Sequence, residues 1–345
     1  MRVSAELVRV TVDQTDKSDP PPAAFLKRLA ASRINVPFMS LAPREYGRRG
    51  LFCVAERDFH HATRLLDLDH YPKQNVEITA KVATIMIYPH RNSLAVPGIV
   101  LRALGRARLP VYGVGSSISA VTVLTDHERL EEAVCEILRD LDLGPGHAPF
   151  HQEPDLSRFR FEMPRMGGLP GTDDNPIFRK TLIPVYDIRQ SGELALVSLS
   201  FDKDDAGPWG ERVRALGEKG AAFTLAIAQA AQPDYLNFMI IADAARTEDM
   251  VRDLDKAARE TPGAVSGVLS PVELLCMYGP HFEERYGIAD AAVSLLDETN
   301  GLLLGACCTG TSVYLLVPGT MGRLAAQILA TRFVVPGARG ADKGD

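Results

Sequence analysis

The stretch that decides the fold is VATIMIYPHRNSLAVPGIVLRALGRARLPVYGVGSSISAVTVLTDHERLEEAVCEIL, residues 82–138. It opens with an apolar run that is typical of a buried strand. A polar loop, His90-Arg91-Asn92-Ser93, precedes a segment whose leucine and isoleucine residues recur on one helical face. Two apolar runs around Gly115-Ser116-Ser117 predict a hairpin, and Asp126 can cap a last helix that runs to about Leu141. The stretch therefore predicts a strand, a helix, two strands and a helix.

The same order of elements recurs in three other parts of the chain. Residues 5–80 read as strand, helix, two strands, helix and strand, with Pro20-Pro21-Pro22 at the start of the first helix. Residues 194–259 and 271–333 repeat the scheme. The predicted fold class is therefore α+β, with repeated ferredoxin-like βαββαβ modules whose antiparallel sheets carry helices on one face.

Residues 144–178 break this pattern, because proline and glycine recur in them. A chain of 345 residues is also longer than one hydrophobic core usually organises, which agrees with several units. The predicted segments are unit 1 at 1–75, unit 2 at 76–143, a Pro/Gly-rich linker at 144–180, unit 3 at 181–261, unit 4 at 262–336 and a disordered tail at 337–345.

The overall charge and the apolar content exclude several classes of protein. The formal net charge is −6, whereas a general nucleic-acid binder usually carries a basic surplus. No apolar run reaches the roughly 18 residues that a membrane helix needs. The acidic Glu6 stands where a signal peptide would be apolar. We therefore expect a cytoplasmic protein that binds neither nucleic acid nor membrane.

The cysteine and histidine residues predict neither a disulfide framework nor a metal site. Five cysteines, an odd number, show no CxxC spacing. His60 and His61 are adjacent at the start of a helix, so their side chains point apart. Gly113-x-Gly115-Ser116-Ser117 resembles a phosphate loop only superficially, because it lies between two strands. We expect no metal and no cofactor.

Residues 82–138 resemble the second ACT domain of aspartate kinases. The resemblance rests on the apolar strand, the loop, the Pro97-Gly98 helix start, the Ser-rich turn between two strands and the helix that an acidic residue opens. Ile34-Asn35-Val36 matches that family's Ile-Asn-Val before a strand. The likeness covers residues 5–142 and extends to 181–335 by internal similarity. It implies a tandem ACT-domain protein similar to the C-terminal regulatory region of these kinases.

The sequence motifs of the kinase domain in that family have no counterpart in this sequence. The chain begins inside the first unit, and neither the family's Lys-Phe/Tyr-Gly-Gly-x-Ser start nor a P-loop, GxxxxGK[ST], occurs. Pro20 and Pro37 stand where the family has Gly and Asp, which weakens the match in unit 1. We therefore predict that the chain is not an enzyme and has no catalytic residues. If it had an activity, the resemblance would make it an aspartate kinase.

In paired ACT domains, effectors bind at the seam, and the resemblance implies that the loop after each first strand faces it. Free N–H groups at a helix start favour a carboxylate there. The implied ligand-binding residues are His90, Arg91, Asn92, Ser93, Ala95 and Val96 in unit 2, Gln14, Asp19 and Asn35 in unit 1, and His281, Phe282 and Arg285 in unit 4. The matching loop of unit 3 holds Asp202, Lys203 and Asp204. The plainer alternative for each set is a solvated polar loop.

These observations predict a non-catalytic regulatory protein. It would bind a small effector, an amino acid such as lysine or threonine, between two units and signal to a partner enzyme. Two alternatives stay open: a regulatory subunit of an aspartate kinase that acts with a separate catalytic chain, and a purely structural interaction protein. We expect a homodimer or an internal pseudo-dimer, since joining sheets edge to edge protects their edges.

Overall fold

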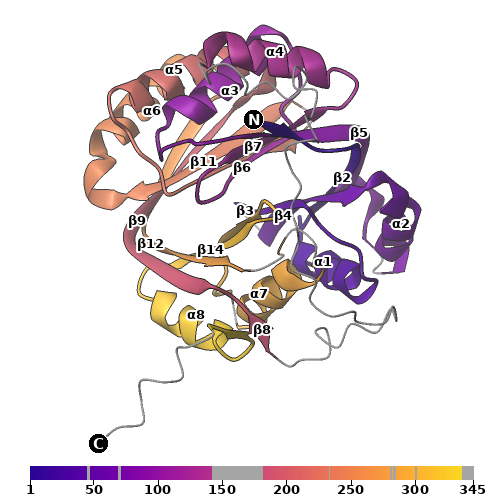
Figure 1. Ribbon diagram of the computed structural model, residues 1–345. Coiled ribbons are helices and arrows are strands. Elements are labelled where there is room, and N and C mark those ends of the chain that lie inside the picture. Colours follow the sequence, from indigo (N-terminus) through magenta and orange to yellow (C-terminus); the bar gives the residue numbers. More distant parts are fainter. Residues whose placement is uncertain are drawn as a thin grey trace, which may run out of the picture.

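A computed structural model gives the arrangement of the chain (Figure 1). It describes residues 1–44, 47–68, 71–141, 182–232, 234–279, 282, 285–299 and 301–335. The predicted linker at 144–180 and the predicted tail at 337–345 lie outside the described residues.

The first half of the chain holds units 1 and 2. Unit 1 consists of β2 (Leu7–Asp13), α1 (Pro22–Ala31), β3 (Phe38–Arg44), β4 (Gly47–Ala55), α2 (Phe59–Leu68) and the start of β5 (Val76–Ile87). Unit 2 consists of the rest of β5, α3 (Ala95–Arg106), β6 (Gly113–Ser116), β7 (Val121–Asp126), α4 (Leu130–Asp140) and β1 (Arg2–Val3). β5 serves both units, because residues 76–79 pair with β2 and residues 82–87 pair with β7.

The second half repeats this plan in units 3 and 4. Unit 3 consists of the end of β9 (Asp187–Asp202), α5 (Ala206–Glu218), β10 (Leu225–Gln232), β11 (Tyr235–Asp243), α6 (Glu248–Glu260) and the start of β12 (Val265–Tyr278). Unit 4 consists of the rest of β12, α7 (Ile288–Asp297), β13 (Gly305–Cys308), β14 (Ser312–Pro318), α8 (Gly322–Leu329) and the start of β9. The short strands β8 (Ile183–Pro184) and β15 (Phe333–Val334) pair separately in parallel.

The last strand of units 2 and 4 comes from the beginning of each half of the chain. Arg2 pairs with Met86 and Val3 with Ile85, so β1 completes the sheet of unit 2. In the same way, residues 187–191 of β9 pair with residues 274–278 of β12 and complete unit 4. The sequence pattern did not reveal this, since it placed unit 2 at 76–143 and unit 4 at 262–336. The predicted domain boundaries stay a prediction.

All the described strands except β8 and β15 form one sheet that closes on itself. Its order is β1-β5-β2-β4-β3-β13-β14-β12-β9-β11-β10-β6-β7, and β5 also pairs with β7. Two faces of this ring lie opposite each other, with α3 to α6 outside one face and α1, α2, α7 and α8 outside the other (Figure 1). The predicted mixture of antiparallel strands and helices is therefore confirmed.

The units join in two pairs across sheet edges. β6 of unit 2 pairs with β10 of unit 3 at residues 113–115, and β3 of unit 1 pairs with β13 of unit 4 at residues 39–41. We call these the 2–3 pair and the 1–4 pair. In each pair the first helices, α3 with α5 and α1 with α7, lie side by side, and we call the boundary between them the seam (Figure 1).

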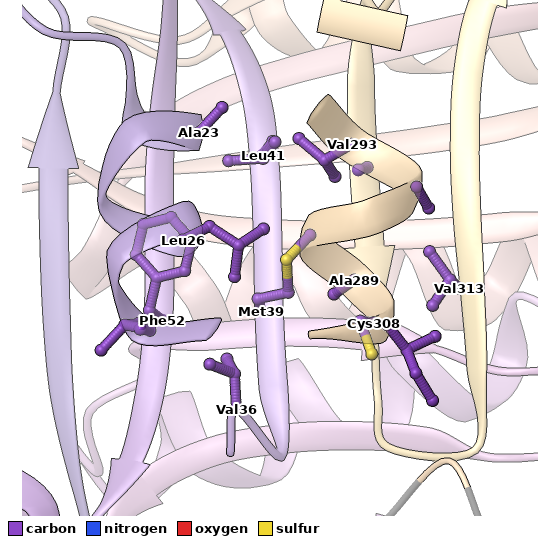
Figure 2. Close-up of a cluster of buried hydrophobic side chains, with 14 of the residues drawn as sticks. Ala23, Leu26, Val36, Met39, Leu41, Phe52, Ala289, Val293, Cys308 and Val313 are labelled. Atoms are coloured by element: carbon purple, nitrogen blue, oxygen red, sulfur yellow. The ribbon is translucent and has the colours of Figure 1, made fainter. Parts of the chain in front are cut away.

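Each pair has one continuous hydrophobic core under its helices, because alternate strand residues face them. In the 1–4 pair, Leu26 of α1, Met39 of β3 and Val293 of α7 belong to the same buried cluster (Figure 2). Residues on the opposite strand faces, among them Leu194, Ile227 and Leu316, fill the space between the two halves of the ring. The four units therefore pack as one body. No helix in the described residues is long and apolar enough to cross a membrane.

Candidate functional site

The polar loop of unit 2, for which the sequence predicted a ligand site, lies at one end of the 2–3 seam. His90 is buried, and Phe223 of unit 3 lies 4.9 Å from its ring. Its Nδ1 accepts a hydrogen bond from the Asn92 N–H at 2.8 Å, so Nε2–H donates to the Ser117 carbonyl at 3.0 Å. Burial lowers the pKa of His90. Both ring nitrogens are thus occupied within the protein.

The backbone N–H groups of this loop also have hydrogen-bond partners within the protein. The Ala95 N–H donates to Ser93 Oγ at 3.2 Å, and the Val96 N–H donates to the Ser93 carbonyl. Unit 3 also takes part, because the Phe223 N–H donates to the Asn92 carbonyl at 2.9 Å. Arg91 is exposed, with a φ of 51°. The N–H groups predicted to receive a carboxylate therefore already have partners.

Glycine allows α3 and α5 to approach closely along the whole seam. A Cβ atom on Gly98 would lie 2.2 Å from the Arg214 nitrogen, and one on Gly210 would lie 2.2 Å from the Arg102 nitrogen. A Cβ atom on Gly217 would lie 1.9 Å from the Ala95 nitrogen, beside the loop of unit 2. Such distances are far below van der Waals contact, so only glycine fits. Protein atoms fill this end of the 2–3 seam.

The 1–4 seam is built from alanine instead. α1 reads PAAFLKRLAA and α7 reads IADAAVSLLD, and neither contains glycine. Figure 2 shows Ala289 and Val293 of α7 beside Leu26 and Ala23 of α1, with Met39 and Leu41 of β3 beneath them. A cavity of about 440 Å³ opens along these helices. We call it the seam cavity.

Charged groups of both signs line the seam cavity. Arg285 lies just before α7, and Asp290 lies in its first turn. Asp290 accepts a hydrogen bond from the Ser294 hydroxyl at 2.8 Å, and burial raises the pKa of its carboxyl group, although Ser294 and Lys27 oppose the shift. Lys27 of α1 and Glu298 form an exposed ion pair at 3.3 Å. Apart from that pair, one anionic group, Asp290, and two cationic groups, Arg285 and Arg332, line the same cavity.

The start of α7 contributes backbone donors to the seam cavity. Gly287 precedes the helix with a φ of 80°, and no side chain among the described residues caps α7. Gly287 and Ile288 both line the cavity. The first N–H groups of a helix lack partners within it and favour an anion. A carboxylate would therefore find donors from both the backbone and Arg285.

The other predicted residues of units 1 and 4 take different places. Arg285, Phe282 and Asn35 line a smaller space of about 20 Å³ next to the seam cavity, where Phe282 is buried in the core. Asn35 Oδ1 accepts a hydrogen bond from the Val36 N–H at 2.9 Å. His281 lies outside the described residues. Of the three described residues, only Arg285 also lines the larger seam cavity.

Hydrogen bonds between residues of unit 1 itself hold the loop of this unit. Asp19 accepts hydrogen bonds from the Thr15 hydroxyl at 2.9 Å and from Asn75 at 2.8 Å, besides two backbone N–H groups. These bonds, that of Thr15 first, lower the pKa of the carboxyl group. Gln14 Nε2 donates to the Asp19 carbonyl at 3.3 Å. The carboxylate stabilises the loop through Oδ2, which accepts all four of these bonds.

The loop of unit 3 is more open. Asp202 accepts a hydrogen bond from the Asp204 N–H at 2.9 Å, and Lys203 pairs with Asp234 at 3.0 Å. Lys203 and Asp204 line a second cavity of about 770 Å³, where units 1, 2 and 3 meet. The end of the 2–3 seam near Lys203 therefore opens into a cavity, whereas the end near His90 is filled by protein atoms.

Sequence reasoning missed Asp290 and the cavity beside it. Asp290 stands in the first turn of a mostly apolar helix, IADAAVSLLD, and this charge among apolar residues was the available signal. In the parts of the chain that the structure describes, no group of three or more His, Cys, Asp or Glu residues could hold a metal ion.

Comparisons with known proteins rest on structure. No family model matches the sequence, and no curated protein matches it. Aspartate kinase from Synechocystis matches with a TM-score of 0.73 and 13% identity, over 95% of this chain and 54% of that one. The ligand-free regulatory subunit of aspartate kinase from Thermus thermophilus matches with a TM-score of 0.35 and 15% identity, over 41% of this chain and 97% of that one. The regulatory subunit of aspartate kinase from Thermus flavus matches with a TM-score of 0.37 and 13% identity, over 42% of this chain and 95% of that one.

The chain is thus similar in fold to an aspartate kinase and spans about half the length of that protein, 54%. The comparison overturns the prediction that the chain is not an enzyme, because the structure matched over 95% of the chain is that of an enzyme. The prediction depended on missing kinase motifs. A sequence that spans only part of its structural relative gives no ground for that exclusion.

Proposed function

We propose that this chain is an amino-acid-sensing regulatory region of an aspartate kinase, built from four ACT modules. The strand order β5-β2-β4-β3 in unit 1, with two helices on one face, is the arrangement of a βαββαβ module. The other three units repeat it, and the 1–4 and 2–3 pairs form the internal pseudo-dimer. A homodimer of the whole chain stays a prediction.

The seam cavity is the observation that carries this proposal. A free amino acid presents a carboxylate and an ammonium group a few ångströms apart, and the cavity offers a partner for each. Arg285 and the first N–H groups of α7 would take the carboxylate, since charge-assisted hydrogen bonds are the strong ones. Asp290 would take the ammonium group. Ala30 and Ala291 leave the room for the effector's side chain.

An effector in this position would bridge units 1 and 4. It would bind better to one packing of α1 against α7 than to another, and this difference in affinity is what coupling to a distant site requires. The receiver would be a kinase domain, either joined to this chain or in a separate catalytic chain. The effector test is the same for both arrangements.

The experiment is a thermal-shift screen of the purified chain against the twenty amino acids, followed by calorimetric titration of any that stabilise it. A ligand at a hundred times its dissociation constant adds about 2.7 kcal/mol to the free energy of unfolding. Arg285→Ala should weaken binding by about tenfold to a hundredfold, as expected for the loss of a charge-assisted hydrogen bond.

Arg323→Ala is the matched control, because Arg323 is an exposed arginine on α8 of the same unit. It should leave the affinity unchanged. If no amino acid stabilises the chain, or if both variants bind alike, the effector site proposed here is wrong, and a purely structural interaction protein becomes the better reading.

A further inference from the structure

The cavity of about 770 Å³ lies where three units meet, and we call it the junction cavity. Unit 1 contributes Arg9 of β2 and Glu77 of β5. Unit 2 contributes Arg108 and Tyr112, which follow α3, and unit 3 contributes Lys203. Its volume lies within the range of about 300–1,000 Å³ that is usual for small-molecule sites.

Arg9 is the unusual member of this lining. Val8 and Val10 on either side of it face the core of the 1–4 pair, so Arg9 points to the opposite face of the sheet. It is 1% exposed. It pairs with Glu77, donates to Thr79 Oγ1 at 2.7 Å, and its guanidinium lies 4.6 Å from the centre of the Tyr112 ring.

One donor of this buried side chain is unused. Among the described residues, Nε of Arg9 has no hydrogen-bond partner. Leaving a buried donor unsatisfied costs about 1–3 kcal/mol, and more for a charged group. The chemistry that fits an arginine N–H is that of a carboxylate or phosphate oxygen.

The charges behind Arg9 add to the attraction. Arg49 pairs with Asp13 and lies 3.3 Å from Glu77, while Arg44 also pairs with Asp13 at 3.5 Å. The cluster thus combines three arginines with two carboxylates, which leaves one positive charge in excess. Arg49 donates to the Ala231 carbonyl of unit 3 at 3.0 Å, so the cluster itself connects two units.

A second cation stands on another wall of the junction cavity. Arg108 is exposed, with a φ of 50°, and no ion pair is found for its side chain among the residues that the structure describes. Lys203 lies on the third wall and pairs with Asp234. Cations on separate walls suit a ligand with anionic groups at both ends.

We propose that the junction cavity binds a small organic anion that carries at least two carboxylate or phosphate groups. One group would pair with the guanidinium of Arg9, and the other would pair with Arg108. Because three units form the walls, the bound anion would hold unit 1 against the 2–3 pair. This site is separate from the seam cavity, which belongs to units 1 and 4.

The test is isothermal titration of the full chain with citrate and with pyrophosphate, at constant ionic strength set with chloride. The two probes separate a carboxylate ligand from a phosphate ligand. We expect saturable binding of at least one probe, weakened about tenfold or more in Arg108→Gln through loss of a charge-assisted hydrogen bond. Arg9→Lys, which keeps the charge and lacks the planar guanidinium, should show a similar loss.

Arg64→Gln is the matched control, because Arg64 is an exposed arginine on α2, away from the junction cavity. It should bind like the wild type. If Arg9→Lys does not fold, the affinity of Arg108→Gln alone tests the proposal. Arg285→Ala should bind the anion normally, so this test does not depend on the amino-acid site. The proposal is overturned if neither probe binds saturably up to about 10 mM, or if Arg108→Gln binds like Arg64→Gln.

Discussion

The 2–3 seam and the 1–4 seam have the same strand order and the same placement of helices, but the helices of the 2–3 seam pack through glycine, whereas those of the 1–4 seam pack through alanine and leave a cavity along them. In the 2–3 seam, Gly98 and Gly210 let the backbone of each helix touch the other. In the 1–4 seam, alanine side chains separate α1 from α7, and a cavity of about 440 Å³ remains.

The difference between the two seams shows how a repeated fold can divide its tasks. A seam whose backbones touch is filled by protein and can support the assembly. A seam held apart by methyl groups leaves a cavity, in which we propose that the effector binds. Glycine or alanine at a few helical positions is enough to separate these roles.

The largest expected effect comes from breaking the glycine contact of the 2–3 seam. Gly210→Ala would place a Cβ atom 2.2 Å from the Arg102 nitrogen, so the helices must move apart. We expect the free energy of unfolding to fall by about 3 kcal/mol or more, as measured by urea denaturation.

Gly207→Ala on the same helix is the control. Its Cβ atom would lie 3.5 Å from its nearest neighbour, the Arg106 nitrogen, which is an ordinary contact. The free energy of unfolding should change by less than about 1 kcal/mol. Equal effects of the two substitutions would mean that close helix packing does not hold this seam.

A smaller effect concerns the response of the 2–3 seam to acid. Burial lowers the pKa of His90, so the folded protein favours the neutral ring, whereas the unfolded chain binds a proton near the usual value of 6.5. The stability that His90 contributes is present above that value and is lost as the pH falls through the folded pKa. Between about pH 7.5 and about pH 5.5, we therefore expect the free energy of unfolding to fall.

The measurement is the free energy of unfolding at several pH values, for the wild type and for His90→Asn. The variant should lose this part of the pH dependence. His60→Asn changes an exposed histidine and should keep it. If both variants follow the wild type, the burial of His90 does not make this seam sensitive to acid.

Much of the local structure could be predicted from the sequence, because apolar runs such as residues 82–88 alternate with helical faces and turns. One strand that the sequence did not predict is β1, because a run of two residues, Arg2–Val3, is too short to show a pattern. Its partner is more than eighty residues away, and pairing at that distance depends on the tertiary fold.

The candidate site was harder to predict, since it depends on which units meet. His90 reads as a polar loop residue, and its burial results from Phe223 of another unit. The glycines were visible, because Gly98 and Gly105 lie seven residues apart, as do Gly210 and Gly217. That spacing places each pair on nearly the same face of its helix. This spacing was a signal for the close packing of α3 against α5.

The most direct test of the account compares the two seams by titration with the amino acid that the screen identifies. Ala291→Leu would fill part of the seam cavity, and Arg91→Ala would alter the exposed loop at the 2–3 seam. We predict that Ala291→Leu weakens binding at least about tenfold, while Arg91→Ala leaves the affinity unchanged. Loss of binding in Arg91→Ala, with normal binding in Ala291→Leu, would contradict the account and place the effector at the 2–3 seam.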